Sequence, residues 1–189
     1  MAKTQLPAET RLVQSFKELA AATPIDRITI QQITDRAGVI RPTFYRHFHD
    51  KYHLLETILV NDLLVPIRPL IANGMMAEAL RVIFHSIEHE KPFYTQIAKL
   101  KGQNSFESMI TTGIQQILCA MIETQMQGRT PHNRWLTPEH ISGYYAVTMT
   151  HVLLSWIESG MDLSPAELAE VYEYIISRSL IDTLSDIDA

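Results

Sequence analysis

The sequence contains a single cysteine, Cys119, so an intramolecular disulfide is excluded. Its apolar context, ILCAMI, predicts a buried and unreactive thiol. Long hydrophobic runs are also missing. The most apolar stretch, YYAVTMTHVLLSWI, is too short and too polar to span a bilayer, and the first ten residues lack the apolar run of a signal peptide. We therefore expect a cytoplasmic protein with no membrane partner.

Several other patterns have no counterpart in the sequence. No stretch alternates polar and apolar residues in the sustained way that a β-sheet needs, whereas helical periodicity is widespread. A phosphate-binding P-loop, a dinucleotide fingerprint and a nucleophile elbow are all absent. These observations predict an all-α protein that is not an enzyme and needs no cofactor or metal.

One segment keeps an enzymatic alternative open. HSIEH fits the zinc-binding pattern H-x-x-E-H, in which His85 and His89 would be ligands and Glu88 a base. No third ligand is identifiable nearby, and histidines are common on helix surfaces. A zinc-dependent hydrolase is therefore the remote alternative.

Charge is unevenly distributed along this acidic chain, whose formal net charge is −5. Through residue 55 there are eight Lys or Arg and five Asp or Glu, whereas the remainder has eight basic and sixteen acidic residues. A local basic excess is a weak indicator of nucleic-acid binding. It draws attention to the segment GVIRPTFYRHFHDKYHLL, at residues 38–55.

Helix signals around this segment are well marked. A first helix is predicted over about residues 8–22, ended by Pro24 and Asp26. Thr29 and Gln32 have capping-box spacing, which predicts a second helix to about residue 36. Gly38 and Pro42 predict a turn and a third helix through residue 48. A fourth helix is predicted to begin after the N-cap Asp50 and to end at the prolines 66 and 69.

The rest of the chain predicts longer amphipathic helices near residues 75–89, 91–100, 104–127, 138–159 and 165–184. Thr137 before Pro138, and Ser164 before Pro165 with Glu167, are N-terminal helix signals. With no glycine-rich linker present, we expect the two parts of the chain to share the fourth helix.

The third helix has the layout of a DNA-recognition helix. At 100° per residue, Phe44 and Phe48 lie on a buried face, and Arg46 lies at the centre of the opposite face between Pro42 and Thr43. Three further residues extend this surface: Arg41 at the helix start, with Tyr45 and His47 at its flanks. An arginine can donate two hydrogen bonds to guanine, and small apolar groups can contact thymine methyls. We expect Lys51, in the next helix, to contact a phosphate.

The stretch ITIQQITDRAGVIRPTFYRHFHDKYHLLETI resembles the DNA-binding domain of the TetR family of bacterial transcriptional regulators. The resemblance covers about the first sixty residues and implies a helix-turn-helix DNA-binding domain at 1–60, followed by a helical effector-binding and dimerisation domain at 61–189. It implies the following contacts: Thr29, Tyr45, His47 and Lys51 to phosphates, and Arg41, Pro42, Thr43 and Arg46 to bases. Ile40-Arg41-Pro42 replaces the commoner Ser-x-Gly of the family.

In the second half, the segments 138–159 and 165–184 are apolar over nearly their whole circumference. This predicts a homodimer through these helices, as the family resemblance also implies. Methionines, which suit adaptable cavities, are concentrated in the same half. The expected ligand contacts, chosen for polarity or polarisability among apolar neighbours, are Tyr94, Met109, Tyr145 and His151.

Together, these features predict a repressor that binds a palindromic double-stranded operator as a dimer and responds to a small-molecule effector. The bacterial nucleoid would be its location when bound. The segments GQNSFES and SWIESGMDLSPAELAE are also similar to a TetR subgroup that includes regulators of dihydroxyacetone kinase operons. That similarity keeps a second function open, an activator controlled by a protein coregulator.

Overall fold

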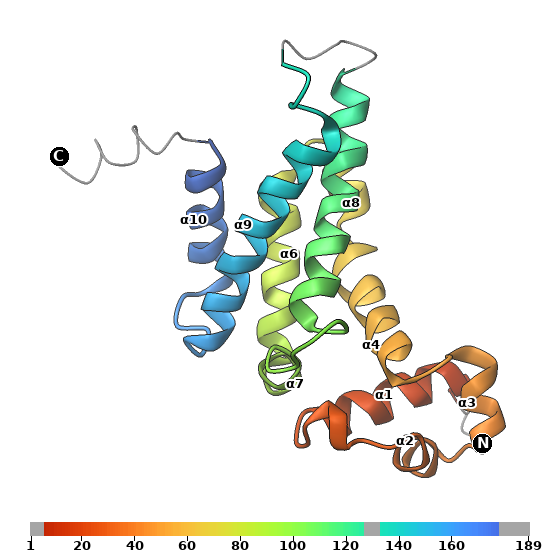
Figure 1. The fold of residues 1–189 in the computed structure, drawn as a ribbon. Coiled ribbons are helices and arrows are strands. Elements are labelled where there is room, and N and C mark those ends of the chain that lie inside the picture. The colour runs from red at the N-terminus through yellow and green to blue at the C-terminus, as the bar shows by residue number, and fades with distance from the viewer. Residues whose placement is uncertain (1–5, 127–132, 178–189) are drawn as a thin grey trace.

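The computed structural model of the protein describes residues 6–126 and 133–177, and every regular element within these ranges is a helix (Figure 1). The all-α prediction is confirmed. The first elements are α1 (Ala8–Ala20), the 3-10 turn η1 (Ile25–Arg27), α2 (Ile30–Ala37), α3 (Arg41–His47) and α4 (Lys51–Leu59). They are followed by the π-helical segment η2 (Val60–Leu64), α5 (Arg68–Ala72), α6 (Met76–His89), α7 (Lys91–Ile97), α8 (Phe106–Met126), α9 (Pro138–Glu158) and α10 (Pro165–Ser177). None of the helices described here has the length and apolarity needed to cross a membrane.

Side chains cap the helices where the sequence predicts it. The backbone N–H of Gln32 donates to the Thr29 hydroxyl, and the side-chain oxygen of Gln32 accepts the backbone N–H of Thr29 in return. The Asp50 carboxylate accepts two N–H groups of the first turn of α4. Thr137 and Ser164 cap α9 and α10 in the same way. The predicted end of the last helix, residues 178–184, lies outside the described residues.

The helical path that begins with α4 ends close to the predicted prolines, but its last turn is π-helical. After α4 the chain widens into the π-helical segment η2, which ends at Leu64, just before Pro66; there the Val65 N–H donates to the Val60 carbonyl. Pro69 then lies in the first turn of α5, where a missing N–H costs no helical hydrogen bond. The predicted end of the fourth helix at Pro66 is therefore confirmed, whereas the short helix that contains Pro69 was not predicted.

We call residues 6–59 the head and the described residues 60–177 the body. In the head, α1, α2 and α3 pack around Leu12, Phe16, Ile33 and Phe44, all fully buried. Helix α4 leads from α3 into the body, as Figure 1 shows. The expectation that the two parts share this helix is thus confirmed for the described chain, whereas the boundary at residue 60 stays a prediction.

In the body, α8 packs along α9 and α6 packs along α10, with α10 at the outer edge of the molecule (Figure 1). Three aromatic residues join α6, α9 and α10: the Phe84 ring centroid lies 5.8 Å from Trp156 and 4.9 Å from Tyr172. The Trp156 indole donates to the Leu163 carbonyl at 2.9 Å, which secures the turn between α9 and α10. One apolar core therefore connects all three helices.

Three charged residues connect the head to the body. The Lys17 ammonium on α1 lies 2.5 Å from an Asp62 oxygen in η2 and 2.7 Å from a Glu90 oxygen between α6 and α7. It also lies 5.8 Å from the centre of the Phe93 ring. Burial would lower the pKa of Lys17, but the hydrogen bonds and charges of the two carboxylates outweigh burial and raise it. Lys17 is therefore a charged contact point between the two parts.

Candidate nucleic-acid interface

The turn between α2 and α3 is built on a glycine and an arginine. Gly38 adopts the left-handed conformation, with φ of 63°, that ends α2 and redirects the chain. One guanidinium nitrogen of Arg11, on α1, donates to the carbonyls of Ala37 at 2.8 Å and Gly38 at 3.2 Å. A cation at the C-terminus of α2 also complements the helix dipole. The angle between α2 and α3 is thus fixed from both sides.

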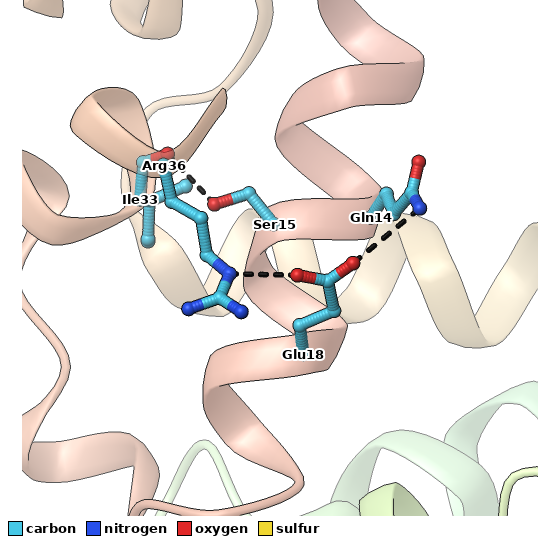
Figure 2. Close-up of polar contacts among 5 residues, drawn as sticks. All are labelled: Gln14, Ser15, Glu18, Ile33 and Arg36. Atoms are coloured by element: carbon cyan, nitrogen blue, oxygen red, sulfur yellow. Dashed lines mark hydrogen bonds and ion pairs between the residues drawn. The ribbon is translucent and has the colours of Figure 1, made fainter. Parts of the chain in front are cut away.

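Polar contacts also hold α2 against α1 (Figure 2). The buried Ser15 hydroxyl donates to the Ile33 carbonyl at 2.8 Å. The Arg36 Nε donates at 2.7 Å to Glu18, whose other oxygen accepts from Gln14. Helices α1, α2 and α3 consequently form a rigid support for whatever side chains α3 exposes.

Helix α3 has a buried and an exposed face, as the sequence predicts. Phe44 and the following Phe48 are buried, with ring centroids 5.6 Å apart. On the opposite face Arg41, Pro42 and Arg46 are exposed, and Thr43 is half-buried. No hydrogen bond or ion pair to another described residue holds the Arg46 guanidinium, so it is free to bind a partner.

The flanking residues of α3 have partners within the head. An Nη of Arg41 donates to the Tyr45 hydroxyl at 3.3 Å, and its guanidinium lies 6.0 Å from the Tyr45 ring centre. His47 Nδ1 lies 3.7 Å from a Glu9 oxygen on α1. These contacts restrict the side chains at the edge of the exposed face while leaving Tyr45 accessible.

The structure gives Lys51 a role that sequence reasoning missed. Its ammonium donates to the carbonyls of Ile25, Asp26 and Ile28 at 2.7, 3.0 and 2.9 Å, so all its hydrogens are in use. Burial lowers the Lys51 pKa, and the carboxylates of Asp26 and Asp50 oppose that shift. To contact a phosphate, the Lys51 ammonium would have to release one of these three carbonyls. The phosphate contact stays a prediction. The sequence around Lys51 gives no sign of this role, because the three carbonyls belong to a distant part of the chain.

An open groove runs between the start of α1, the end of α2 and α3. Ile40, Thr43 and Arg46 line it along α3, and Arg11 and Asp35 contribute its polar wall on the other side. The Asp35 carboxylate accepts a hydrogen bond from Gln31 at 2.5 Å, which restrains it. Of the predicted base contacts, Thr43 and Arg46 therefore share one surface. Thr29 is exposed at the start of α2.

Two models of known protein families match the chain. One describes bacterial regulatory proteins of the tetR family and matches residues 16–58, which hold the helix-turn-helix just described. The other describes a transcriptional regulator C-terminal region of the same family and matches residues 75–178, more than half of the chain. The chain belongs to the TetR family. Its head is accordingly a DNA-binding domain, and the chain is a transcriptional regulator.

Solved structures of TetR-family regulators share the fold. The dihydroxyacetone kinase operon activator DhaS is 22% identical, with a TM-score of 0.63 over 90% of this chain and 92% of that one. NalD, the secondary repressor of the MexAB-OprM efflux pump in Pseudomonas aeruginosa, is 19% identical, with a TM-score of 0.57 over 87% and 92%. Thermus thermophilus FadR, solved with lauroyl-CoA, is 19% identical, with a TM-score of 0.59 over 91% and 94%. A search of curated protein sequences gave no match.

The body of this TetR-family chain contains a fully apolar cavity of about 50 Å³. Its walls come from η2, α5, α6, α8, α9 and α10 and include Leu64, Ile71, Leu80, Ile114, Leu153 and Tyr172. Met76 and Met149 also line it, as expected of methionines near an adaptable cavity. Burial raises the pKa of Tyr172, and its hydroxyl donates to the Met149 carbonyl and not into the cavity.

The structure does not bring the four predicted ligand residues together. Tyr94 is buried in the core, with its ring 6.2 Å from Phe106, and burial next to the carboxylates of Asp62 and Glu90 raises its pKa. Met109 packs against the core outside the cavity. Tyr145 lines a separate groove between α9 and α10, and His151 is exposed. None of the four residues lines the apolar cavity, and their part in ligand binding stays a prediction.

The outer surfaces of α9 and α10 are apolar. Tyr144 is 70% exposed and Val147 is 62% exposed on α9, and Val171, Ile175 and Ile176 are exposed on α10. Large exposed side chains on two adjacent helices form the kind of surface that proteins cover with a partner. The predicted excess of apolar surface on these helices is thus present in the structure.

The metal-site alternative gains no support. Within the described ranges, the ligand atoms of His85, Glu88 and His89 do not gather within 4.8 Å of one another. The residues whose ligand atoms do are Cys119, Glu123 and Glu139, on α8 and α9. Cys119 is half-buried with its sulfur 4.0 Å from a Glu123 oxygen, so the prediction of a buried thiol was wrong. Cys119 lies on a side of α8 that solvent reaches, which its apolar neighbours in sequence concealed.

Proposed function

We propose that this TetR-family regulator binds a palindromic operator as a homodimer and represses transcription until an effector binds the body. The observation that carries the proposal is the exposed, internally unpaired Arg46 on a rigidly braced α3, beside Arg41, Pro42 and Thr43. An arginine in this position can donate two hydrogen bonds to guanine in the major groove. In the cell, this activity takes place in the cytoplasm on chromosomal DNA.

Dimerisation explains how one short helix would select an operator. Two α3 helices about 34 to 36 Å apart read successive major grooves on one side of the duplex, and their two-fold symmetry requires a palindrome. The apolar surfaces of α9 and α10, centred on Tyr144, Val147 and Ile175, are the proposed contact between protomers. In one chain the head lies away from α9 and α10 (Figure 1), so a dimer through these helices would leave both heads free to contact DNA.

The apolar cavity is the proposed effector site. At about 50 Å³ it is far smaller than the roughly 300 to 1,000 Å³ typical of ligand pockets. An apolar or amphipathic effector would therefore stabilise a widened arrangement of α6, α8 and α9. An effector that binds only the widened form shifts the population away from the form that fits the operator.

The test begins with selection of duplexes from a random pool by the purified protein. A palindromic consensus with half-sites separated by about one helical turn supports the proposal. Sedimentation should then show two protomers on each duplex. Recovery of sequences with no common motif, or of a single unrepeated half-site, would contradict it.

Activation under the control of a protein coregulator is the second candidate. The observation in its favour is the likeness to DhaS, a protein described as an operon activator, together with the small size of the cavity. A reporter gene placed behind the selected operator separates the two. Repression predicts higher expression when the regulator is deleted, and activation predicts lower expression.

A further inference from the structure

Ile40, the residue immediately before α3, is unusually exposed for a branched aliphatic side chain. It is 69% exposed, and the other large hydrophobic residues exposed in the head are Leu6 and Tyr45. Tyr45 has a hydroxyl that bonds Arg41, whereas Ile40 has no polar group. An isolated exposed isoleucine on the working surface of a binding domain therefore needs a specific explanation.

The backbone position of Ile40 makes the choice of residue more informative. Ile40 is the N-cap of α3, with φ of −91° and ψ of 154°, and its carbonyl accepts the Thr43 N–H at 2.9 Å. The N-caps of α2 and α4, Thr29 and Asp50, both use their side chains to bond the helix. Isoleucine cannot do so, and serine or aspartate in its place would stabilise α3. Helix α3 thus lacks a side-chain cap at its start, and the residue in the cap position exposes an apolar group.

Ile40 lies on the same surface as two residues expected to contact bases. Together with Thr43 and Arg46 it lines the open groove beside α3. Positions three apart on a helix are neighbours on its surface, so these side chains form one continuous row. The row presents an aliphatic group at the N-terminal end, a hydroxyl in the middle and a guanidinium at the far end.

We infer that Ile40 recognises the 5-methyl group of a thymine in each operator half-site. This inference rests on the proposed function, because it requires α3 to lie in the major groove. The thymine methyl is the apolar group that base pairs display in that groove, and an aliphatic side chain gains by covering it. Ile40 is therefore a specificity-determining residue, and the thymine it covers lies in the same half-site as the base pair read by Arg46.

Replacement of single thymines by deoxyuridine tests this assignment directly, because it removes the methyl group and leaves base pairing intact. Each thymine of the selected operator is replaced in turn, and the affinity of the wild-type protein and of Ile40→Ser is measured. We expect one or two replacements per half-site to weaken wild-type binding about fourfold, the value of one methyl-sized apolar group. Ile40→Ser should bind the same duplexes with unchanged affinity at those positions.

Two controls keep the test specific. Ile40→Ser restores a capping side chain, so its thermal unfolding should occur at or above the wild-type temperature, which excludes misfolding as the cause. Leu6→Ser removes another exposed aliphatic group of the head and should keep the wild-type deoxyuridine profile. Identical profiles for wild type and Ile40→Ser would overturn the inference while leaving the proposed function intact. If the selection yielded no specific duplex, both would fail.

Discussion

At the scale of single residues, two cations of the head differ in what they already bind. The Arg46 guanidinium has no hydrogen bond or ion pair to another described residue, whereas the Lys51 ammonium donates to three backbone carbonyls. Removal of the Arg46 side chain should therefore affect DNA binding alone and leave the stability of the protein unchanged. Removal of Lys51 should affect the folded protein itself, because carbonyls of η1 and Ile28 lose their donor.

For Arg46→Ala we expect affinity for the selected operator to fall by about 1 to 3 kcal/mol, with relaxed discrimination at one or two base pairs. Affinity for random duplex should change little, and stability should be unaltered. The affinities of wild type and Arg46→Ala for the selected operator and for random duplex, measured in parallel, test this prediction. Arg81→Ala, an exposed arginine on α6, is the matched control and should alter neither affinity. Equal losses on both duplexes would show that Arg46 meets phosphates and not bases.

For Lys51→Met, which keeps the aliphatic stem, we expect the free energy of unfolding to fall by about 1 to 3 kcal/mol. The predicted phosphate contact requires, in addition, that the slope of log affinity against log salt falls by roughly 0.9. Urea denaturation and a salt series measure the two effects separately. A stability loss with an unchanged slope would assign Lys51 to the architecture of the head alone.

At the scale of elements, helix starts were predictable because their signals are local. Thr29, Asp50, Thr137 and Ser164 each cap the helix that follows them. Helix α5 and the π-helical η2 were missed because a proline both ends one helix and starts another, and only the packing of the body decides between these outcomes.

The candidate DNA-binding surface was predictable for a similar reason. The exposed face of α3 follows from helical geometry once its ends are known. The partners of Arg11, Lys17 and Lys51 were not predictable, because each lies on an element brought close only by the tertiary fold. The apolar cavity was not predictable, since its lining depends on which apolar side chains fail to fill space, a property of packing and not of residue type.

The contact between α1 and the body gives a third prediction. Lys17→Met should lower the free energy of unfolding by about 1 to 3 kcal/mol, because the partly buried carboxylates of Asp62 and Glu90 lose their counter-charge. Arg36→Met breaks the exposed pair with Glu18 in Figure 2 and should cost less than about 1 kcal/mol. Chemical denaturation at neutral pH measures the free energy of unfolding of both variants and of the wild type. Equal costs would mean that Lys17 contributes no more than a surface ion pair.

The same contact has a defined pH dependence. The folded-state pKa of Lys17 is raised, so its contribution to stability is complete below its unfolded pKa, at about 10.4, and is lost as pH rises through the folded value. The difference in stability between wild type and Lys17→Met should therefore stay constant from about pH 7 to 10 and shrink above that. A difference that shrinks on acidification to pH 6 would point to another group.

At the scale of the whole molecule, the proposed dimerisation would connect the body to DNA recognition. A monomer presents one α3 and contacts one half-site, whereas a dimer gains the second half-site without a further loss of translational freedom. The exposed apolar surfaces of α9 and α10 lie on the body, away from α3 (Figure 1). In the proposed dimer, a change at these surfaces would therefore alter DNA binding without touching the head.

Val147→Glu should convert the dimer to a monomer at micromolar concentration, because a carboxylate in an apolar interface is left without a partner. Operator affinity should fall more than about tenfold. Sedimentation velocity and operator binding measure the two effects. Val82→Glu places the same charge at an exposed valine of α6, at 37% exposure, and should leave the dimer intact. A dimeric Val147→Glu protein would place the interface elsewhere.

The position of Lys17 sets a condition for building hybrid regulators. A gene fusion that carries residues 1–59 onto the sensing module of another protein would separate Lys17 from Asp62 and Glu90. The transplanted lysine would then face a foreign surface beside whatever replaces Phe93. A functional graft would need carboxylates engineered at the two corresponding positions, or a neutral residue in place of Lys17. The choice of crossover point is thus dictated by an ion cluster and not by the end of a helix.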